Sequence, residues 1–144
     1  MKWATRAGVH VDRAACAWLI RRFVDPAAEF VFVTDPTAVH EGVTPFDIRG
    51  AELGHHGNRC SFESILEQFG LTDPALEEIG RIVHQADLAD DTYDAPVAAG
   101  LDVLIRGLGL LQHDDAVLLT VTDQLFDGLY EHTRKRLLTG RPPS

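Results

Sequence analysis

Cysteine is scarce in this chain. Of its 144 residues only Cys16 and Cys60 are cysteines, and no Cys-x-x-Cys pair is present. Two cysteines are too few for a disulfide scaffold, and their spacing is not that of a zinc ribbon. Long apolar runs are lacking too, since none approaches the roughly 20 residues that span a bilayer. No apolar segment of a signal peptide follows Met1. We therefore expect a cytoplasmic protein that does not enter a membrane.

Net positive charge and the common nucleotide-binding motifs are also missing. The formal net charge is −9, which argues against general affinity for DNA, because nonspecific binding relies on Lys and Arg against phosphate. The chain has no Gly-x-Ser-x-Gly, P-loop or Gly-x-Gly-x-x-Gly motif. The first 25 residues differ in charge, with five Lys and Arg against two Asp. This basic stretch either serves a small anion or pairs with the acidic remainder of the chain.

Composition and hydrophobic pattern predict a single small α/β (α+β) domain over residues 1–144. Hydrophobic residues make up 45% and charged residues 24% of the chain, as in ordinary globular proteins. A short sheet of about three strands near the N-terminus should pack against four to five helices. We expect strands over 9–11, 29–34 and 45–48, helices over 13–23, 62–69, 74–89, 96–111 and 116–138, and a frayed tail over 140–144.

Short polar side chains stand directly before most of these helices. Their oxygens accept hydrogen bonds from the first free backbone N–H groups, so they predict where each helix begins. Gly70 in turn should follow the end of the helix over 62–69, since glycine favours the position after a helix. The expected N-caps are Asp12, Ser61, Asp73 and either Asp114 or Asp115.

A histidine and several carboxylates in the middle of the chain point to a divalent ion. His84 and Asp87 are three residues apart on a predicted helix, so both project from one face. Asp91 continues that row if the helix lasts another turn. A histidine and a carboxylate on adjacent turns suit zinc, manganese or iron. The alternative is a helix that ends in solvated acids beside a surface histidine.

A second cluster lies upstream and supplies residues of the same kind. His55 and His56 occupy a Gly-flanked loop, and Cys60 and Glu63 follow at the entry to a helix. Glu63 is expected in the first turn, where a carboxylate meets the positive end of the helix. His55 and Glu63 could complete a metal site with the downstream pair, or the two histidines could simply be solvated.

The basic N-terminal stretch offers a different kind of site. His10 and Asp12 are two residues apart on a predicted strand and should share a face, although capping already explains Asp12. Arg6, Arg13 and the free N–H groups at the start of the next helix could instead cradle an oxyanion.

Several motifs of this chain recur together in one known family. They are Trp3-x-Thr5-Arg6, Val11-Asp12-Arg13-x-Ala15-Cys16-x-Trp18-Leu19-Ile20-Arg21-Arg22-Phe23, Phe46-Asp47, His55, Cys60-Ser61-Phe62-Glu63 and Ile82-Val83-His84-x-x-Asp87. Through them the chain resembles the chromate-resistance family, as a stand-alone form of the ChrB-type C-terminal domain. The resemblance implies a bacterial role in resistance to chromate, in some members as a regulator of a chromate efflux pump.

The chain also departs from the family pattern. Ala17 stands where the family often has proline, which argues against a redox role for Cys16. His56 stands where many members carry a residue that cannot bind metal, so His55 is the better ligand candidate. The extra N-terminal region of the longer, regulator-type members is not seen, and DNA is therefore an unlikely partner of this short form.

Three functions remain open at this point. The first is a cytoplasmic metal-binding domain whose zinc, manganese or iron ion acts on a small anion such as chromate, as an enzyme or as a binding protein. The second is a metal-free sensor or regulatory module for chromate or a related oxyanion. The third is a structural module that forms a homodimer through its C-terminal helix. The expected metal ligands are His55, Glu63, His84 and Asp87, with Asp12, Cys60 and Asp91 as neighbours, and the expected anion-binding residues are Arg6, Arg13 and Arg21.

Overall fold

A computed structural model describes residues 1–140 of the chain and shows a small parallel sheet with helices packed against it. Strand β1 (Lys2–Arg6) lies between β2 (Glu29–Val33) and β3 (Thr44–Pro45), and both neighbours run parallel to it. The α+β class and the three-stranded sheet predicted from the sequence are confirmed. The predicted tail, apart from Gly140, lies outside the described residues.

Two of the predicted strands differ from those in the structure. The strand over 9–11 is wrong, because Gly8 turns the chain with a φ of 89° and Val11 already begins a helix. The strand over 45–48 is confirmed only at its first residue. Asp47 has a φ of 49°, which takes the chain out of the extended conformation directly after β3. The strand predicted over 29–34 is confirmed as β2.

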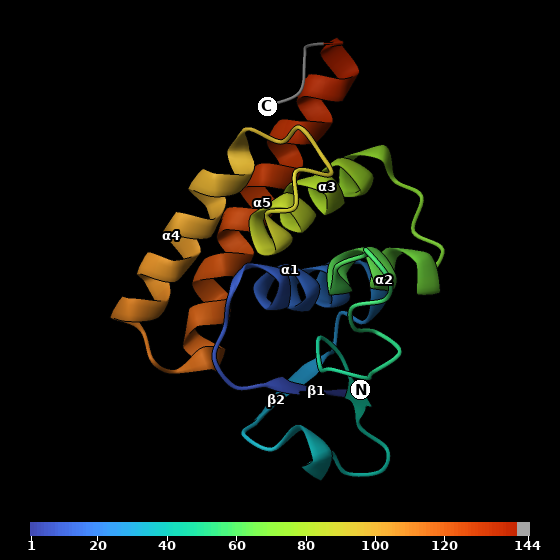
Figure 1. Cartoon of the computed structure of the whole chain (residues 1–144), viewed down its shortest axis with the longest axis vertical. Coiled ribbons are helices and arrows are strands. Elements are labelled where there is room, and N and C mark those ends of the chain that lie inside the picture. The colour runs from blue at the N-terminus through green and yellow to red at the C-terminus, as the bar shows by residue number, and fades with distance from the viewer. Residues whose placement is uncertain (141–144) are drawn as a thin grey trace.

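Helix α1 (Val11–Leu19) is the central element of the fold, and each of its residues is buried. It continues as a π-helical turn over Ile20–Val24 and ends before Asp25, as the Asp-Pro pair predicts. The other helices are α2 (Ser61–Gln68), α3 (Pro74–Leu88), α4 (Val97–Leu111) and α5 (Asp115–Thr139), and α1 contacts all four. Figure 1 shows α1 and α2 between the sheet and α3.

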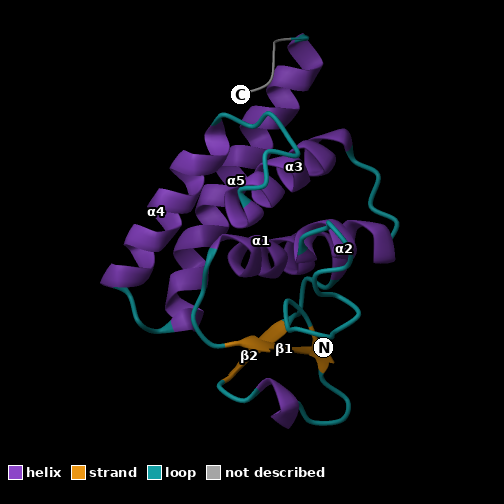
Figure 2. Cartoon of the chain, viewed as in Figure 1, coloured by secondary structure: helices purple, strands orange, loops and turns teal. Residues whose placement is uncertain are grey.

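The helices of the second half begin and end close to the predicted positions, and Figure 2 shows how far helix dominates there. Asp73 accepts a hydrogen bond from the backbone N–H of Ala75 at 2.8 Å, and Asp114 accepts one from Ala116 at 3.0 Å. Both predicted N-caps are therefore confirmed. Gly70, with a φ of 60°, follows the end of α2 as predicted.

Two other predicted N-caps are wrong. His10 is the N-cap of α1 and Cys60 that of α2. Asp12 lies in the first turn of α1, where its carboxylate accepts the backbone N–H groups of Ser61 at 2.9 Å and Phe62 at 3.0 Å. Asp12 therefore caps α2 instead of its own helix, and it ties the N-terminus of α2 to α1.

Helix α5 buries only part of its apolar side chains. Leu118, Leu119 and Phe126 are buried, whereas Val121 is 39% exposed.

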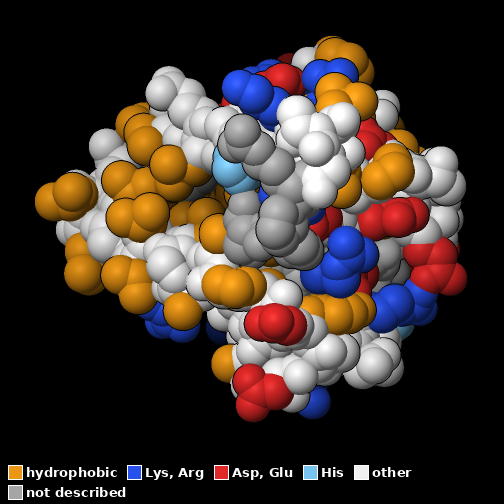
Figure 3. Space-filling view, turned by 90° about the horizontal axis from the view of Figure 1, so that it is seen from above, with side chains coloured by type: hydrophobic (Ala, Val, Ile, Leu, Met, Phe, Trp, Pro, Cys, Tyr) orange, Lys and Arg blue, Asp and Glu red, His pale blue; other side chains and the backbone are white. Residues whose placement is uncertain are grey.

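A group of exposed apolar side chains lies on α4, and Figure 3 shows hydrophobic side chains gathered on that flank of the molecule. A homodimer through the C-terminal helix stays a prediction. Among the described residues, no helix is long and apolar enough to cross a membrane. The exposed large apolar side chains of α4 are those of Val103, Leu104, Leu110 and Leu111.

The loop that carries His55 is closely packed against its own backbone. Phe46 and Leu53 form an isolated parallel bridge, and the N–H of Asp47 donates to the Leu53 carbonyl at 3.0 Å. A Cβ atom at Gly54 would lie only 2.7 Å from the carbonyl oxygen of Ile48. Glycine at this position is therefore needed for the fold of the loop.

We expect Gly54→Ala to lower the free energy of unfolding by about 1–3 kcal/mol, the usual cost of overpacking. The matched control is Gly100→Ala in α4, where a Cβ meets nothing within 4 Å. That change should raise the stability by about 0.5–1 kcal/mol, because alanine favours helix over glycine. Denaturant unfolding measures both variants, and equal stability of Gly54→Ala and the unchanged protein would contradict the proposed packing.

Candidate functional site

An open cavity of about 500 Å³ lies where β1, the start of α1, the loop after β3 and α3 meet. Charged and titratable side chains dominate its lining, although they come from distant parts of the sequence. We call it the pocket. The residues that matter for its chemistry are Arg6, His10, Arg13, Asp47, Arg49, His55 and Asp87.

The fully buried carboxylate of Asp12 lies directly beneath the pocket. Besides the two N–H groups of α2, its oxygens contact the thiol of Cys16 at 3.5 Å and the Nε2 atom of His55 at 3.1 Å. Asp12 therefore positions His55 as well as α2. Its two oxygens are already engaged by hydrogen-bond donors on the protein.

Two histidines and two further carboxylates meet above Asp12. The Nε2 atom of His55 lies 3.4 Å from Asp87 and 3.9 Å from Asp47. His10 lies close to the same acids, with Nδ1 3.6 Å from Asp87 and Nε2 3.8 Å from Asp47. Of the residues here, Asp12, His55 and Asp87 have donor atoms within 4.8 Å of one another, the spacing that a shared cation needs, and His10 and Asp47 lie beside them.

Burial and crowding shift the acid–base behaviour of this set. Burial, followed by the charge of Asp12, raises the pKa of Asp47 to about 7 and that of Asp87 to about 6. Burial, followed by the charge of Arg13, lowers the pKa of His10 to about 4. His10 is therefore a neutral imidazole at pH 7. The hydrogen bond to Asp12 is the main reason why the pKa of His55 is raised.

Three polar atoms of the pocket are buried without a hydrogen-bond partner among the described residues. They are Nδ1 of His10, Nε of Arg13 and Oδ2 of Asp47, and the last two form an ion pair with each other at 3.1 Å. Because the great majority of buried polar atoms in folded proteins have a partner, each such atom calls for an explanation. The ion pair accounts for the atoms of Arg13 and Asp47. Nδ1 of the neutral His10 imidazole is left, and it is an electron-pair donor that is able to bind a cation.

The arginines of the pocket fall into two kinds. Arg13 is buried and engaged, with Nε 3.1 Å from Asp47 and Nη1 donating to the Gly8 carbonyl at 2.5 Å. Arg6 and Arg49 are exposed, and neither has an ion pair or side-chain hydrogen bond within residues 1–140. Two unpaired guanidinium groups thus stand at the mouth of the pocket.

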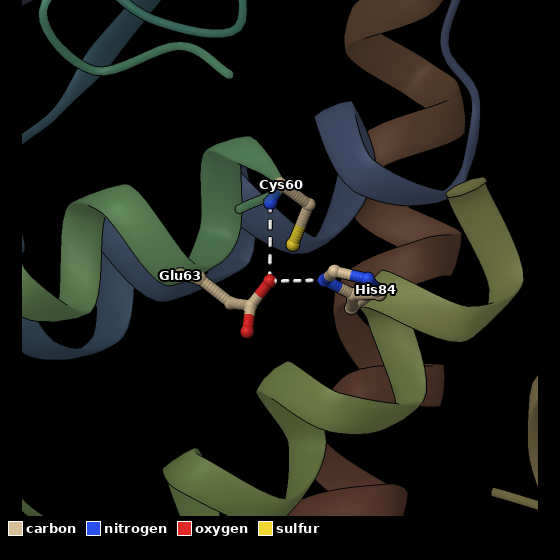
Figure 4. A group of neighbouring side chains, drawn as sticks. All are labelled: Cys60, Glu63 and His84. Carbon is tan, nitrogen blue, oxygen red and sulfur yellow. Dashed lines mark hydrogen bonds and ion pairs between the residues drawn. The ribbon is translucent and has the colours of Figure 1, made fainter. Parts of the chain in front are cut away.

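A second polar cluster joins α2 to α3, and Figure 4 shows its three central side chains. Glu63 accepts the backbone N–H of Cys60 at 3.1 Å, and its Oε1 atom lies 2.5 Å from Nδ1 of His84. The other ring nitrogen of His84 contacts Asp90 at 2.9 Å, and Tyr93 donates its hydroxyl to Glu63 at 2.9 Å. Burial alone would lower the pKa of His84, but the hydrogen bonds to the two carboxylates outweigh it and raise that pKa.

The structure divides the four predicted metal ligands between these two clusters. His55 and Asp87 lie in the pocket with Asp12, whereas Glu63 and His84 lie in the second cluster with Cys60. His84 and Asp87 share α3, yet each joins a different group.

Two further site predictions differ from the arrangement that the structure shows. Asp91 belongs to neither cluster, because α3 ends at Leu88 and the chain then turns through residues with positive φ. Arg21 lies outside the pocket, where its guanidinium pairs with Asp123 at 2.6 Å. Arg6 and Arg13 line the pocket as predicted.

Sequence reasoning missed several residues of the two clusters as site candidates. Asp47 carried a signal, since the Phe46-Asp47 pair is part of the family pattern. Asp90 stands beside the predicted ligands in the sequence and could have been included on that ground. Arg49 and Tyr93 gave no signal, because only the folded loops bring them to the pocket mouth and to Glu63.

Comparison with known proteins agrees with the motifs. The family described as ChrB, C-terminal domain, matches residues 3–133. The curated Protein ChrB of Cupriavidus metallidurans is 39% identical over 134 residues, which are 91% of this chain but 40% of that protein. The chain thus spans less than half the length of this relative. No solved structure matches. With the family matching almost from end to end, the chain belongs to the chromate-resistance family of ChrB C-terminal domains.

Proposed function

We propose that this domain binds a divalent metal ion in the pocket, with His55 and Asp87 as the main ligands and His10 and Asp47 beside them. The observation that carries the proposal is that donor atoms of His55, Asp87 and Asp12 lie within 4.8 Å of one another, beside the buried Nδ1 atom of His10, which has no hydrogen-bond partner among the described residues. His10 and Asp47 line the same pocket as His55 and Asp87. A cytoplasmic location stays a prediction.

The donor set fits a borderline or hard ion. Imidazole suits zinc and iron, whereas carboxylates suit manganese and magnesium, so a mixed set favours zinc, manganese or iron. Asp12 fits a supporting role better than a direct one, because its oxygens already accept two backbone N–H groups. Asp12 contacts the same Nε2 atom of His55 that faces Asp87, so it lies on the ligand side of the ring and not behind it.

We further propose that the ion and the arginines together take a small oxyanion such as chromate. Arg6 and Arg49 are unpaired at the pocket mouth and would attract an anion toward the bound ion. A metal ion can polarise an oxygen of such a ligand or activate water beside it. The membership of the chromate-resistance family makes chromate the first oxyanion to test.

A metal-free oxyanion module is the second candidate, and the same two unpaired arginines favour it. Three carboxylates oppose it, however, because Asp12, Asp47 and Asp87 lie in or beneath the same pocket. Without a cation they would repel an anion that enters. We therefore place the metal-dependent function first.

The metal proposal predicts which substitutions remove metal. The full chain is stripped with a chelator, reconstituted with zinc, manganese or iron and measured by mass spectrometry. Loss of a residue that only supports a ligand weakens metal binding by about 10–100-fold. We expect His55→Ala and Asp87→Asn to weaken it by more than this. The matched controls are His56→Ala, whose ring contacts the Glu52 carbonyl, and Asp91→Asn, and they should bind as tightly as the unchanged protein. Unchanged pocket metal in His55→Ala would contradict the proposal.

Chromate or sulfate separates the two candidate functions. With metal bound, an anion at 100 times its dissociation constant should stabilise the domain by about 2.7 kcal/mol. The combined Arg6→Ala and Arg49→Ala changes should abolish this stabilisation. Thermal unfolding with and without metal measures it. An equal shift in the metal-free protein would favour the metal-free module instead.

The ionised carboxylate of Asp87 should lower the stability of the metal-free protein at high pH. Its pKa of about 6 in the folded state lies above the usual value near 3.9 in an unfolded chain. A raised carboxyl pKa favours folding at low pH, and this contribution is lost as the pH rises from about 4 through 6. We therefore expect Asp87→Asn to stabilise the metal-free domain at pH 8 by on the order of 1 kcal/mol, within the usual range for stabilising changes. At pH 4 it should have little effect.

Denaturant unfolding in the presence of a chelator checks this at both pH values. Asp91→Asn removes an exposed acid of the loop after α3 and serves as the control for loss of a carboxylate outside the pocket. A loss of stability in Asp87→Asn at pH 8 would contradict the expected crowding of charge in the pocket.

A further inference from the structure

We infer a second metal centre, distinct from the pocket, in which Sγ of Cys60, Oε1 of Glu63 and Nδ1 of His84 bind a thiophilic divalent ion such as zinc. This inference does not depend on the ion proposed for the pocket, because no ligand is shared. It assigns a role to the cysteine and to the buried histidine that the pocket leaves unused.

The three donor atoms lie close together. They all fall within 4.8 Å of one another, and Cys60 and His84 are buried. Cys60 is the N-cap of α2, Glu63 lies one turn further along the same helix, and His84 projects from α3. Figure 4 shows the three side chains turned toward a common point between the two helices.

Two residues outside the set hold the ligands in place. Asp90 contacts Nε2 of His84 at 2.9 Å, which leaves Nδ1 as the ring atom that faces Glu63. Tyr93 donates its hydroxyl to the other oxygen of Glu63 at 2.9 Å. Carboxylates behind a ligating histidine and hydrogen bonds to a ligating carboxylate are regular features of protein metal sites.

An adjoining cavity reaches the Glu63 side of the centre. It measures about 500 Å³ and is lined by Glu63, Tyr93 and Arg81 among others. Three protein ligands with one position open to solvent are the pattern of catalytic zinc sites, whereas structural sites are closed by a fourth protein ligand. Water or a small anion would take the fourth position.

The proton balance of binding is simple. The ion replaces the thiol proton of Cys60 and the proton between His84 and Glu63, and both protons leave to solvent. The proton on Nε2 of His84 stays in place, because this N–H donates to the carboxylate of Asp90. In the metal-free protein burial raises the pKa of Cys60, so the sulfur is then a thiol.

A purely structural cluster is the alternative explanation of this geometry. A protonated His84 held between Glu63 and Asp90 accounts for both of its short contacts without metal. In it the side chain of Cys60 only accepts the backbone N–H of Glu63, as part of a capping box. The presence of a metal–sulfur bond therefore distinguishes the two.

Cobalt(II) is the probe, because a cobalt–thiolate bond produces a charge-transfer band in the near ultraviolet. The metal-free full chain is titrated with Co²⁺. We expect a saturable band in the unchanged protein that disappears in Cys60→Ala. The matched control is Cys16→Ala, which removes the other cysteine and should keep the band. Asp87→Asn should keep it as well, so failure of the pocket proposal and failure of this one are distinguishable.

Tyr93→Phe covers the case in which Cys60→Ala does not fold. This variant keeps all three ligands and removes only the hydrogen bond to Glu63, so the band should remain while the affinity for Co²⁺ falls about tenfold. The inference is overturned if the unchanged protein shows no band, if Cys60→Ala folds and keeps the band, or if Tyr93→Phe binds Co²⁺ as tightly as the unchanged protein.

Discussion

The carboxylate of Asp12 connects the elements on which both clusters depend. It starts from the first turn of α1, the most buried helix, and accepts the two N–H groups that begin α2. Charge-assisted hydrogen bonds of this kind are worth about 1.5–3 kcal/mol each when they are buried. The same carboxylate contacts His55, and the helix that it caps begins at Cys60 and carries Glu63. One side chain therefore fixes the location of both candidate metal centres.

The pocket brings three carboxylates close together, and this arrangement does not favour stability. Asp47 and Asp87 lie near Asp12, and burial raises the pKa of both above that of an exposed carboxyl. Such crowding lowers the stability of the metal-free protein at neutral pH, and a bound cation offsets it. The second cluster differs, because its carboxylates are balanced by His84 and Tyr93. A bound cation would therefore change the local charge balance more in the pocket than in the second cluster.

The sequence predicted the local features better than the long-range ones. The caps Asp73 and Asp114 and the glycine after α2 could be read directly, because each acts on the helix beside it. Asp12 was read as the cap of its own helix, whereas it caps one that begins 49 residues later. No spacing rule contains that partner. The strand over 9–11 failed for a similar reason, since a turn at Gly8 outweighs the β-branched residues after it.

The ligand candidates show the same division between local and long-range information. Helical spacing placed His84 and Asp87 on one face of α3, but tertiary packing assigns each to a different neighbour. Loop residues such as Arg49 and Tyr93 join the clusters only through the folded chain. Family motifs filled part of this gap, because they include Cys60, Glu63, His55 and Asp47 as residue types without stating which of them meet.

Anomalous diffraction from crystals of the full chain grown with zinc tests the pocket ion most directly. Data collected on both sides of the zinc absorption edge locate each ion without reference to the protein. We predict an anomalous peak between Nε2 of His55 and the carboxylate of Asp87, within bonding distance of both. Zinc-containing crystals in which these two side chains contact only each other, with no peak between them, would contradict the proposed metal-binding function of the pocket.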